Sequence, residues 1–333
     1  MNIILEGDHT SFPCEGDTIL RAALRAGLGF PYACNTGSCG NCRFTLVEGS
    51  ITHASPPPAW SERDLKKNRW MGCQAVPQSD CTIKLRLDRS YEPMHKPRRM
   101  ASKFVHATQI THDIFEFSFA LDAPMQALPG QYALIYLPGM DMPRAYSMCE
   151  ISQGGDIWSF QIKLVPGGAG SAALGALEPA ANVGIDGPYG TAFLRPEAPR
   201  DILCIAGGSG LSPMISITRA AAHSPELTGR TIHFVYGGRM IRDLCGQPML
   251  ETLPGYGHRL HYWPVLSNHP IDDPDGWTGA RGYVHEAISE KFGDELGNFE
   301  IYFAGPPPMA GAIKKLLFER GVPQEQVHYD EFY

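Results

Sequence analysis

The sequence predicts a multidomain protein of the α+β and α/β classes: a small mixed unit, then an antiparallel β-barrel, then a parallel-sheet α/β domain. Three observations support this prediction. The chain has 333 residues, more than one hydrophobic core usually organises. Its middle third consists of short strand-like segments separated by turn residues. Its last third alternates strand-like and helix-like segments, the pattern of crossover connections in a parallel sheet.

The composition is that of a soluble globular protein. Hydrophobic residues make up 43% of the chain and charged residues 19%. The longest apolar runs, such as 202–206, fall well short of the roughly 18 residues that a membrane helix needs. The N-terminus leads into Glu6 and Asp8 without a basic region or a cleavage site, so we expect a cytoplasmic protein without membrane insertion. A net charge of -7 argues against binding to nucleic acid.

Residues 1–89 have the pattern of the small mixed unit. Segment 18–26 has helical spacing of its apolar residues, with Asp17 or Thr18 available to cap its start and Gly27 to end it in a left-handed conformation. The strand-like runs of this unit are 3–5, 43–47 and 82–87. Segment 90–100 carries two prolines and three basic residues, Lys96, Arg98 and Arg99. We interpret it as a solvated linker, with a partner-docking site as the alternative.

Residues 101–197 predict the barrel, and residues 198–333 predict the parallel-sheet domain. The strand-like runs of the first region are 114–120, 132–137 and 158–165. Those of the second region are 202–205, 231–236 and 300–304, with a helix expected from about Pro213.

Four of the nine cysteines follow a metal-binding pattern. Cys34, Cys39 and Cys42, followed at a distance by Cys73, have the C-x4-C-x2-C…C spacing of a plant-type [2Fe–2S] cluster. The glycines between them allow the backbone to bend close to a cluster, so that N–H groups can point at its sulfurs. Zinc is the alternative ion for four thiolates. The other cysteines are expected to be buried apolar residues: Cys14, Cys81, Cys149, Cys204 and Cys245.

Three motifs in the barrel region suit a flavin. They are Arg144-Ala-Tyr146-Ser147, Gly168-Ala-Gly170-Ser171 and the run 186–190. An arginine can pair with the flavin pyrophosphate and a tyrosine can lie along the ring system or the ribose. A serine hydroxyl can bond the ring near its reactive nitrogen. The alternative is an ordinary barrel strand with an exposed arginine.

Three motifs in the last region suit a nucleotide. The run Gly207-Gly208-Ser209-Gly210 lies between a strand and a helix, where free N–H groups attract phosphate. It lacks the G-x-G-x-x-G register. Tyr236-Gly237-Gly-Arg239 and Gly305-Pro306-Pro-Pro-Met309 also follow strands, where open α/β sheets bind ligands. The terminal aromatics, Phe332 and Tyr333, are either a frayed or core-tucked end or a cover for a flavin ring.

Together these motifs resemble the ferredoxin–NADP reductase superfamily, and the N-terminal fusion resembles the reductases of bacterial multicomponent oxygenases. The similarity is strongest to the branch that serves toluene and xylene monooxygenases, and it is carried by residues 22–26, 30–34, 65–69 and 282–286. It implies a β-grasp [2Fe–2S] ferredoxin domain (1–89), a linker (90–100), an FAD-binding barrel (101–197) and an NAD-binding domain (198–333).

The resemblance also implies a role for each site residue. The cluster ligands are the four cysteines named above. The residues expected to bind FAD are Arg144, Ala145, Tyr146, Ser147, Lys163, Val165, Gly168, Gly170, Ser171 and Tyr333. Those expected to bind NAD are Gly207, Gly208, Ser209, Gly210, Tyr236, Gly237, Arg239, Gly305, Pro306 and Met309. The positions expected at the hydride-transfer site are Ser147, Tyr333 and Ala304.

Two features of the sequence bear on hydride transfer and on the choice of nucleotide. The family has Cys-Gly-Pro-Pro where this chain has Ala304-Gly-Pro-Pro, a departure that puts the rate of hydride transfer and the placing of the nicotinamide in question. NADPH-specific relatives bind the 2′-phosphate with hydroxyl and basic groups. Here the matching stretch, 267–270, is followed by Asp272, Asp273 and Asp275, whose charges would repel a phosphate. We therefore expect NADH.

The implied activity is electron transfer in an aromatic or alkene monooxygenase system. NADH would reduce FAD, and single electrons would pass through the [2Fe–2S] cluster to a Rieske-type ferredoxin or to the oxygenase hydroxylase component, each bound transiently by a monomer. A reductase of a ring-hydroxylating dioxygenase or of a deoxysugar dehydratase would share this domain order. A redox-sensing or zinc-binding protein on the same fold is the alternative outside the enzymes.

Overall fold

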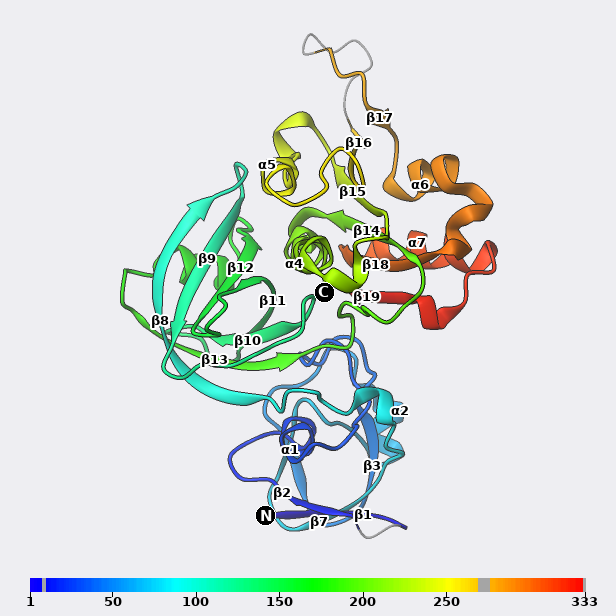
Figure 1. Ribbon diagram of the computed structural model, residues 1–333. Coiled ribbons are helices and arrows are strands. Elements are labelled where there is room, and N and C mark those ends of the chain that lie inside the picture. Colours follow the sequence, from blue (N-terminus) through cyan, green and yellow to red (C-terminus); the bar gives the residue numbers. More distant parts are fainter. Residues whose placement is uncertain (8–9, 269–275, 332–333) are drawn as a thin grey trace.

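The computed structural model describes residues 1–7, 10–268 and 276–331, which form three units around a common centre (Figure 1). Within these residues, no helix combines the length and the apolar character needed to cross a bilayer. Two sets of residues singled out from the sequence lie outside the described part of the chain: the terminal Phe332 and Tyr333, and the acidic Asp272, Asp273 and Asp275. The expected combination of α+β and α/β units is confirmed.

The N-terminal unit is a five-stranded mixed sheet in the order β2-β1-β7-β3-β5, packed against a helix. Its strands are β1 (Asn2–Leu5), β2 (Ser11–Pro13), β3 (Arg43–Glu48), β5 (Arg69–Met71) and β7 (Cys81–Lys84). A separate ribbon pairs β4 (Ile51–His53) with β6 (Ala75–Pro77). The helices are α1 (Ile19–Ala26), α2 (Glu62–Lys66) and the short η1 (Arg89–Tyr91). As predicted, α1 ends at Gly27 with a left-handed φ of 90°.

The second unit is a closed antiparallel barrel in the order β10-β11-β12-β9-β8-β13, which confirms the expected architecture. Its strands are β8 (Arg98–Gln109), β9 (Ile114–Leu121), β10 (Tyr132–Tyr136), β11 (Arg144–Ile151), β12 (Ile157–Lys163) and β13 (Asn182–Tyr189), and α3 (Ala169–Gly175) crosses between the last two. Bulky side chains such as Trp158 and Phe160 fill its interior.

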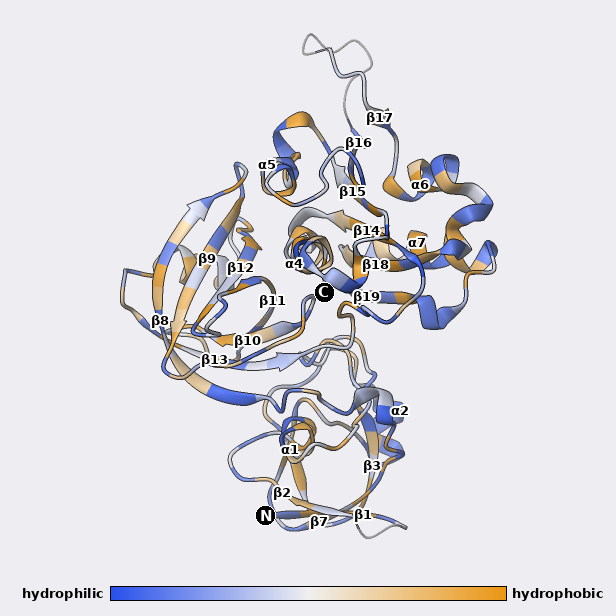
Figure 2. Cartoon of the chain, in the orientation of Figure 1, coloured by the Kyte–Doolittle hydropathy of each residue, from blue (hydrophilic) through white to orange (hydrophobic). Residues whose placement is uncertain are grey.

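The basic stretch differs from the expected solvated linker, because β8 begins inside it. Arg98 donates to the carbonyl of Pro124 at 2.5 Å, and the guanidinium of Arg99 lies 3.8 Å from the centre of the Tyr136 ring. The hydrophilic start of β8 is the blue end of that strand in Figure 2. Proline content made this segment look like a loop, but its backbone pairs with β13 and so extends the barrel sheet.

The third unit is a six-stranded parallel sheet in the order β17-β16-β15-β14-β18-β19. Its strands are β14 (Asp201–Gly207), β15 (Ile232–Gly238), β16 (Leu260–Leu266), β17 (Ala280–Arg281), β18 (Phe299–Gly305) and β19 (Val327–Glu331). The helices are α4 (Leu211–His223), α5 (Gln247–Glu251), α6 (Val284–Phe292) and α7 (Pro307–Glu319), with short turns η2 (Gly208–Gly210), η3 (Pro225–Leu227), η4 (Ile241–Asp243), η5 (Gly293–Asn298) and η6 (Gln324–Gln326). Helices α4 and α5 pack on one face and α6 and α7 on the other.

The first two units share a packed core. Tyr132, Leu134 and Tyr189 of the barrel belong to the same buried cluster as the core residues of the N-terminal unit. Beside it lies a charged network: Arg25 of α1 donates to Asp186 of β13 at 2.7 Å, and the carboxylate of Asp186 is fully buried. Tyr189 donates a second bond to the same carboxylate at 2.9 Å. A buried carboxylate with two donors fixes how α1 sits on the barrel.

This network predicts a large cost for removing one partner. Arg25→Met leaves the Asp186 carboxylate buried without its cation, and we expect the free energy of unfolding to fall by about 3–5 kcal/mol. Denaturant unfolding followed by circular dichroism measures the loss. The control is Lys84→Met, which removes a pair with Glu6 whose lysine side chain is 73% exposed. That change should cost no more than about 1 kcal/mol. Equal losses in the two variants would contradict the account of the interface.

Candidate functional site

The four cysteines of the predicted cluster site lie in the loop between α1 and β3 (Cys34, Cys39 and Cys42) and between β5 and β6 (Cys73), and they meet in two pairs. Contacts between thiols join Cys34 to Cys39 and Cys42 to Cys73. The hydrogen bond from the Cys39 thiol lowers the pKa of Cys34 to about 4, and the same bond raises the pKa of Cys39. The bond between the other two thiols lowers the pKa of Cys42 and raises that of Cys73.

Backbone N–H groups point at the first pair. The amides of Thr36 and Cys39 donate to the Cys34 sulfur at 3.5 Å and 3.4 Å, and the amide of Asn41 donates to the Cys39 sulfur at 3.5 Å. Donors of this kind stabilise thiolates and offset the negative charge of a cluster. Among the described residues, no three His, Cys, Asp or Glu side chains meet as ligands of one ion. The two pairs of thiols, with backbone amides that donate to their sulfurs, suit a [2Fe–2S] cluster in which each iron is bound by one pair of cysteines.

The loop depends on its glycines. Gly37 and Gly40 have φ values of 87° and 82°, which L side chains rarely adopt. A Cβ on Gly40 would overlap the guanidinium of Arg43. That guanidinium donates to the Gly40 carbonyl at 2.8 Å and to the Ala59 carbonyl at 2.6 Å. Arg43 therefore holds the loop against the segment that precedes α2.

A cavity of ≈ 960 Å³ opens where the three units meet. The cluster loop lines one wall, the barrel strands β11 and β12 line another, and β19 with Ser209 lines the third. Its volume suits a ligand of dinucleotide size. All nine described residues of the predicted FAD set border it: Arg144, Ala145, Tyr146, Ser147, Lys163, Val165, Gly168, Gly170 and Ser171.

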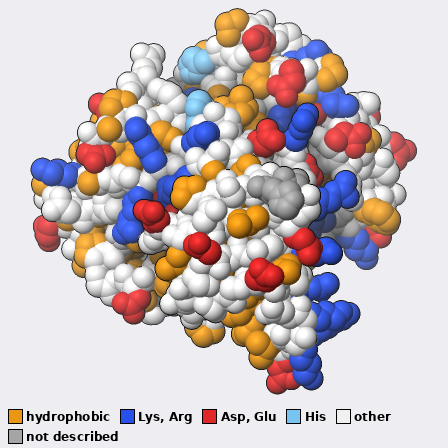
Figure 3. Space-filling view, turned by 90° about the horizontal axis from the view of Figure 1, so that it is seen from below, with side chains coloured by type: hydrophobic (Ala, Val, Ile, Leu, Met, Phe, Trp, Pro, Cys, Tyr) orange, Lys and Arg blue, Asp and Glu red, His pale blue; other side chains and the backbone are white. Residues whose placement is uncertain are grey.

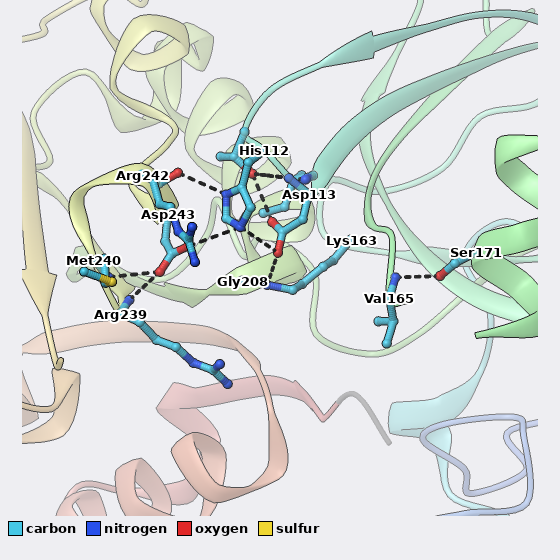
Figure 4. Close-up of polar contacts among 12 residues, drawn as sticks. His112, Asp113, Lys163, Val165, Ser171, Gly208, Arg239, Met240, Arg242 and Asp243 are labelled. Atoms are coloured by element: carbon cyan, nitrogen blue, oxygen red, sulfur yellow. Dashed lines mark hydrogen bonds and ion pairs between the residues drawn. The ribbon is translucent and has the colours of Figure 1, made fainter. Parts of the chain in front are cut away.

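The contacts of these residues show how they are held. Ser171 accepts a bond from the amide of Val165 at 2.8 Å, which closes the glycine turn before α3 (Figure 4). The carbonyl of Ser147 accepts a bond at 2.5 Å from the hydroxyl of Ser212 in α4, so that the barrel wall is tied to the third unit. Arg144 is exposed and makes no ion pair within the described part of the chain, which leaves its guanidinium available to a phosphate.

Lys163 also has a partner in the protein. Its ammonium lies 2.6 Å from Asp113, and His112 lies between Asp113 and Asp243, at 3.3 Å and 3.7 Å from their carboxylate oxygens (Figure 4). Asp243 accepts bonds from two backbone amides in the loop after β15. The structure thus places Lys163 in a polar bridge between the barrel and the third unit.

Most of the predicted NAD residues lie together at the carboxyl ends of β14 and β18. Tyr236 donates to the Gly208 carbonyl at 3.2 Å. A Cβ on Gly207 or on Gly305 would press on Met309, and one on Gly210 would overlap the carbonyl of Ala304. Ser209 alone of the predicted NAD set borders the flavin-sized cavity.

Three predicted residues lie apart from these contacts. Gly237 and Arg239 lie at and just after the end of β15, and Pro306 caps α7. Ala304 is fully buried and packs with α4 in the core of the third unit. The alanine side chain therefore faces protein at the position where the resemblance placed a catalytic cysteine.

Sequence reasoning missed several residues of the cavity. Tyr132 borders it and donates its hydroxyl at 2.5 Å to the carbonyl of Ala33, next to Cys34. Asn35 and Gln74 are buried there with polar side-chain atoms that have no hydrogen-bond partner in the described residues. Asp330 also borders it, with its Oδ2 buried and lacking a described partner. No local pattern marks Tyr132, because its hydroxyl acts across a boundary between units.

Burial raises the pKa of Asp330 from 3.8 to about 7. The folded chain therefore holds this proton more tightly than the unfolded chain does. The resulting stabilisation is complete below about pH 4 and is lost as the pH rises through about 7.

Asp330→Asn should remove this dependence. We expect the free energy of unfolding of the FAD-free protein to decline less between about pH 4 and pH 7 in the variant than in the parent chain. Denaturant unfolding at a series of pH values measures the difference, with the exposed Asp156→Asn as the control. Identical pH profiles for parent and D330N would show that this carboxyl is solvated.

Comparison with known proteins gives the same three units. The model of the 2Fe-2S iron-sulfur cluster binding domain matches residues 3–78. The oxidoreductase FAD-binding domain matches residues 101–193, and the oxidoreductase NAD-binding domain matches residues 204–315. Together with the site geometry, these matches define an oxidoreductase with FAD, a [2Fe–2S] cluster and a nicotinamide nucleotide as its cofactors.

Relatives extend over the whole chain. The ferredoxin–NAD(P)+ reductase CarAd of Metapseudomonas resinovorans is 36% identical over 99% of this chain and 98% of its own length. The ferredoxin–NAD+ reductase component of the alkene monooxygenase system of Xanthobacter autotrophicus is 35% identical, covering 98% of each. The xylene/toluene monooxygenase electron transfer component XylA of Pseudomonas putida is 32% identical over 96% of this chain and 89% of its own.

Solved structures also match over the whole chain. The ferredoxin reductase in carbazole 1,9a-dioxygenase superposes with a TM-score of 0.90 at 32% identity, covering 100% of this chain and 98% of that one. The Amycolatopsis cytochrome P450 reductase GcoB superposes at 0.83 with 26% identity, covering 99% and 98%. The chain belongs to the ferredoxin–NAD(P)+ reductase family that includes the reductase components of oxygenase systems.

Proposed function

We propose that this chain is the NADH-dependent reductase component of an aromatic or alkene monooxygenase system, and that it delivers single electrons through its cluster to a Rieske-type ferredoxin or to the hydroxylase itself. The observation that supports this most strongly is the single cavity bordered both by the flavin-motif residues and by the loop of Cys34 and Cys39. A flavin held there would adjoin the cluster within one chain.

Different residues of the cavity would bind different parts of the cofactor. FAD would accept two electrons together and release them singly, which is chemistry that the protein side chains lack. Arg144 supplies a cation for the pyrophosphate, and Ser171 closes the turn beside it. Ser147 and Tyr146 lie on β11 where they can orient the ring system. Tyr132 holds the cluster loop against the same wall.

The third unit would hold the nicotinamide nucleotide. The turn 207–210 leads from β14 into α4, the place in α/β sheets where amides and the helix dipole favour phosphate. The assignments of Tyr236, Arg239 and Met309 to this site remain predictions, as do the domain boundaries and the preference for NADH. A cytoplasmic monomer also remains part of the proposal.

Service to a ring-hydroxylating dioxygenase is the second candidate, because the ferredoxin reductase in carbazole 1,9a-dioxygenase is among the solved structures that match over the full length. Reconstitution separates the two: the purified chain is mixed with NADH and either a di-iron monooxygenase or a Rieske dioxygenase with its ferredoxin. Faster substrate hydroxylation with the first partner set supports the proposal, and turnover with the second set alone overturns the monooxygenase assignment. A deoxysugar dehydratase partner would give turnover with neither.

The cluster ligands predict a separation of two activities. Cys39→Ala removes one ligand, so it should abolish NADH-driven reduction of cytochrome c while reduction of a two-electron dye continues. Both rates are read by absorbance. The matched control is Cys81→Ala, which changes a buried cysteine of the same unit whose thiol donates to the Ser50 carbonyl at 3.5 Å. We expect it to keep both activities.

Loss of dye reduction in a folded C39A variant with full flavin content would contradict the proposed electron order. Absorption of the parent protein tests the alternative outside the enzymes, because a redox-sensing or zinc-binding protein would show neither a flavin band nor an iron–sulfur shoulder.

A further inference from the structure

A group of unpaired cations lies on the outer side of the N-terminal unit. Arg63, Lys66, Lys67 and Arg69 are all exposed, and none makes an ion pair within the described residues. Leu65 lies among them with 57% of its surface exposed. These five residues, here called the α2 patch, present positive charge around one apolar side chain. In Figure 1 α2 lies at the flank of this unit, beside β3.

The α2 patch is fixed rather than free to move. Ser61 caps α2 by accepting a bond from the amide of Asp64, and the buried Asp64 carboxylate accepts bonds from the amide and the hydroxyl of Ser61. Trp60 precedes α2 and Trp70 lies on β5; their rings pack 5.8 Å apart, and the indole N–H of Trp60 donates to the Arg69 carbonyl at 2.8 Å. A capped helix flanked by packed aromatic rings presents its side chains in a defined arrangement.

One side chain joins the α2 patch to the cluster loop. Arg43 follows the ligand Cys42 directly, and its guanidinium lies 3.2 Å from the Asp64 carboxylate while it donates to the Gly40 carbonyl. Arg43 therefore links the cluster loop to Asp64, which lies in α2 between the patch residues Arg63 and Leu65. Asn41 and Arg43 are exposed, whereas Cys42 and Cys73 are buried.

The charge of the α2 patch opposes that of the molecule. The whole chain carries -7, and an acidic protein repels other acidic proteins at long range. Across α2 the two carboxylates are Asp64, which is used internally by Ser61 and Arg43, and Glu62, which faces solvent. Seen from below, Lys and Arg side chains gather along one edge of the molecule (Figure 3). A local cationic surface would give an anionic partner one favoured approach.

We propose that the α2 patch is the docking surface for an acidic one-electron carrier protein. The inference rests on the proposed function, since it names the face by which electrons leave the cluster. Each encounter oxidises the cluster by one electron and reduces the metal centre of the carrier by one. Two encounters discharge the electron pair of one NADH, with release of NAD+ and a proton. Leu65 supplies the apolar contact at the centre, and the cations set orientation and encounter rate.

The test compares two acceptor proteins of opposite charge. The full-length holoprotein is mixed with NADH and either plastocyanin, a small acidic copper protein, or cytochrome c, a small basic haem protein, over a range of salt concentrations. The test variant is Lys66→Glu with Lys67→Glu. The matched control, Lys103→Glu with Lys315→Glu, makes the same change in net charge at exposed lysines of the barrel and of α7.

At low salt, the test variant should reduce plastocyanin about tenfold more slowly than the parent chain, and the difference should shrink as salt is added. Reduction of cytochrome c should not slow, and the control variant should match the parent with plastocyanin. If the two variants slow the reduction of plastocyanin equally, the proposal that the α2 patch is the docking surface is wrong. The parent chain could also reduce ferricyanide with NADH and reduce neither plastocyanin nor cytochrome c. That result would contradict both the proposed transfer of electrons out through the cluster and the proposed docking surface.

Discussion

The contact on which the arrangement depends is the hydrogen bond from the Tyr132 hydroxyl to the Ala33 carbonyl, 2.5 Å long and half-buried between two units. Ala33 precedes the first cluster ligand, and Tyr132 borders the flavin-sized cavity. A second bond in the same interface runs from the amide of Gly190 to the hydroxyl of Tyr32 at 2.8 Å. Both bonds tie the barrel to the stretch of chain that enters the cluster loop, so they set where the cluster lies relative to the flavin wall.

The other boundaries are held by different chemistry. Between barrel and third unit, Ser212 joins Ser147, and the bridge of Lys163, Asp113 and His112 lies nearer the surface. The barrel thus shares a buried core and a charged network with the N-terminal unit, and it meets the third unit through the packing of β11 and β12 on α4 together with polar bonds. The closely packed first interface suits electron transfer over a fixed distance.

Features that depend on residues close together in the chain could be predicted from the sequence. The spacing of the four cysteines, the glycine turn 207–210 and the alternation of strands and helices each depend on residues near one another in the chain. The flavin motifs on β11 and α3 could be predicted for the same reason. The start of β8 at Arg98 could not, because prolines and charges dominate that stretch, while its partner in β13, Gly187, lies far along the chain. Tyr132 was hidden likewise, since its importance comes from a carbonyl in another unit.

Rapid mixing of NADH with the holoprotein tests whether Tyr132 holds the cluster loop beside the flavin wall. Bleaching of the flavin band and of the iron–sulfur shoulder is followed in the parent chain and in Tyr132→Phe, which keeps the ring and removes the bond to Ala33. We expect the flavin phase to persist and the cluster phase to become slower. A cluster phase as fast in the variant as in the parent would contradict this expectation.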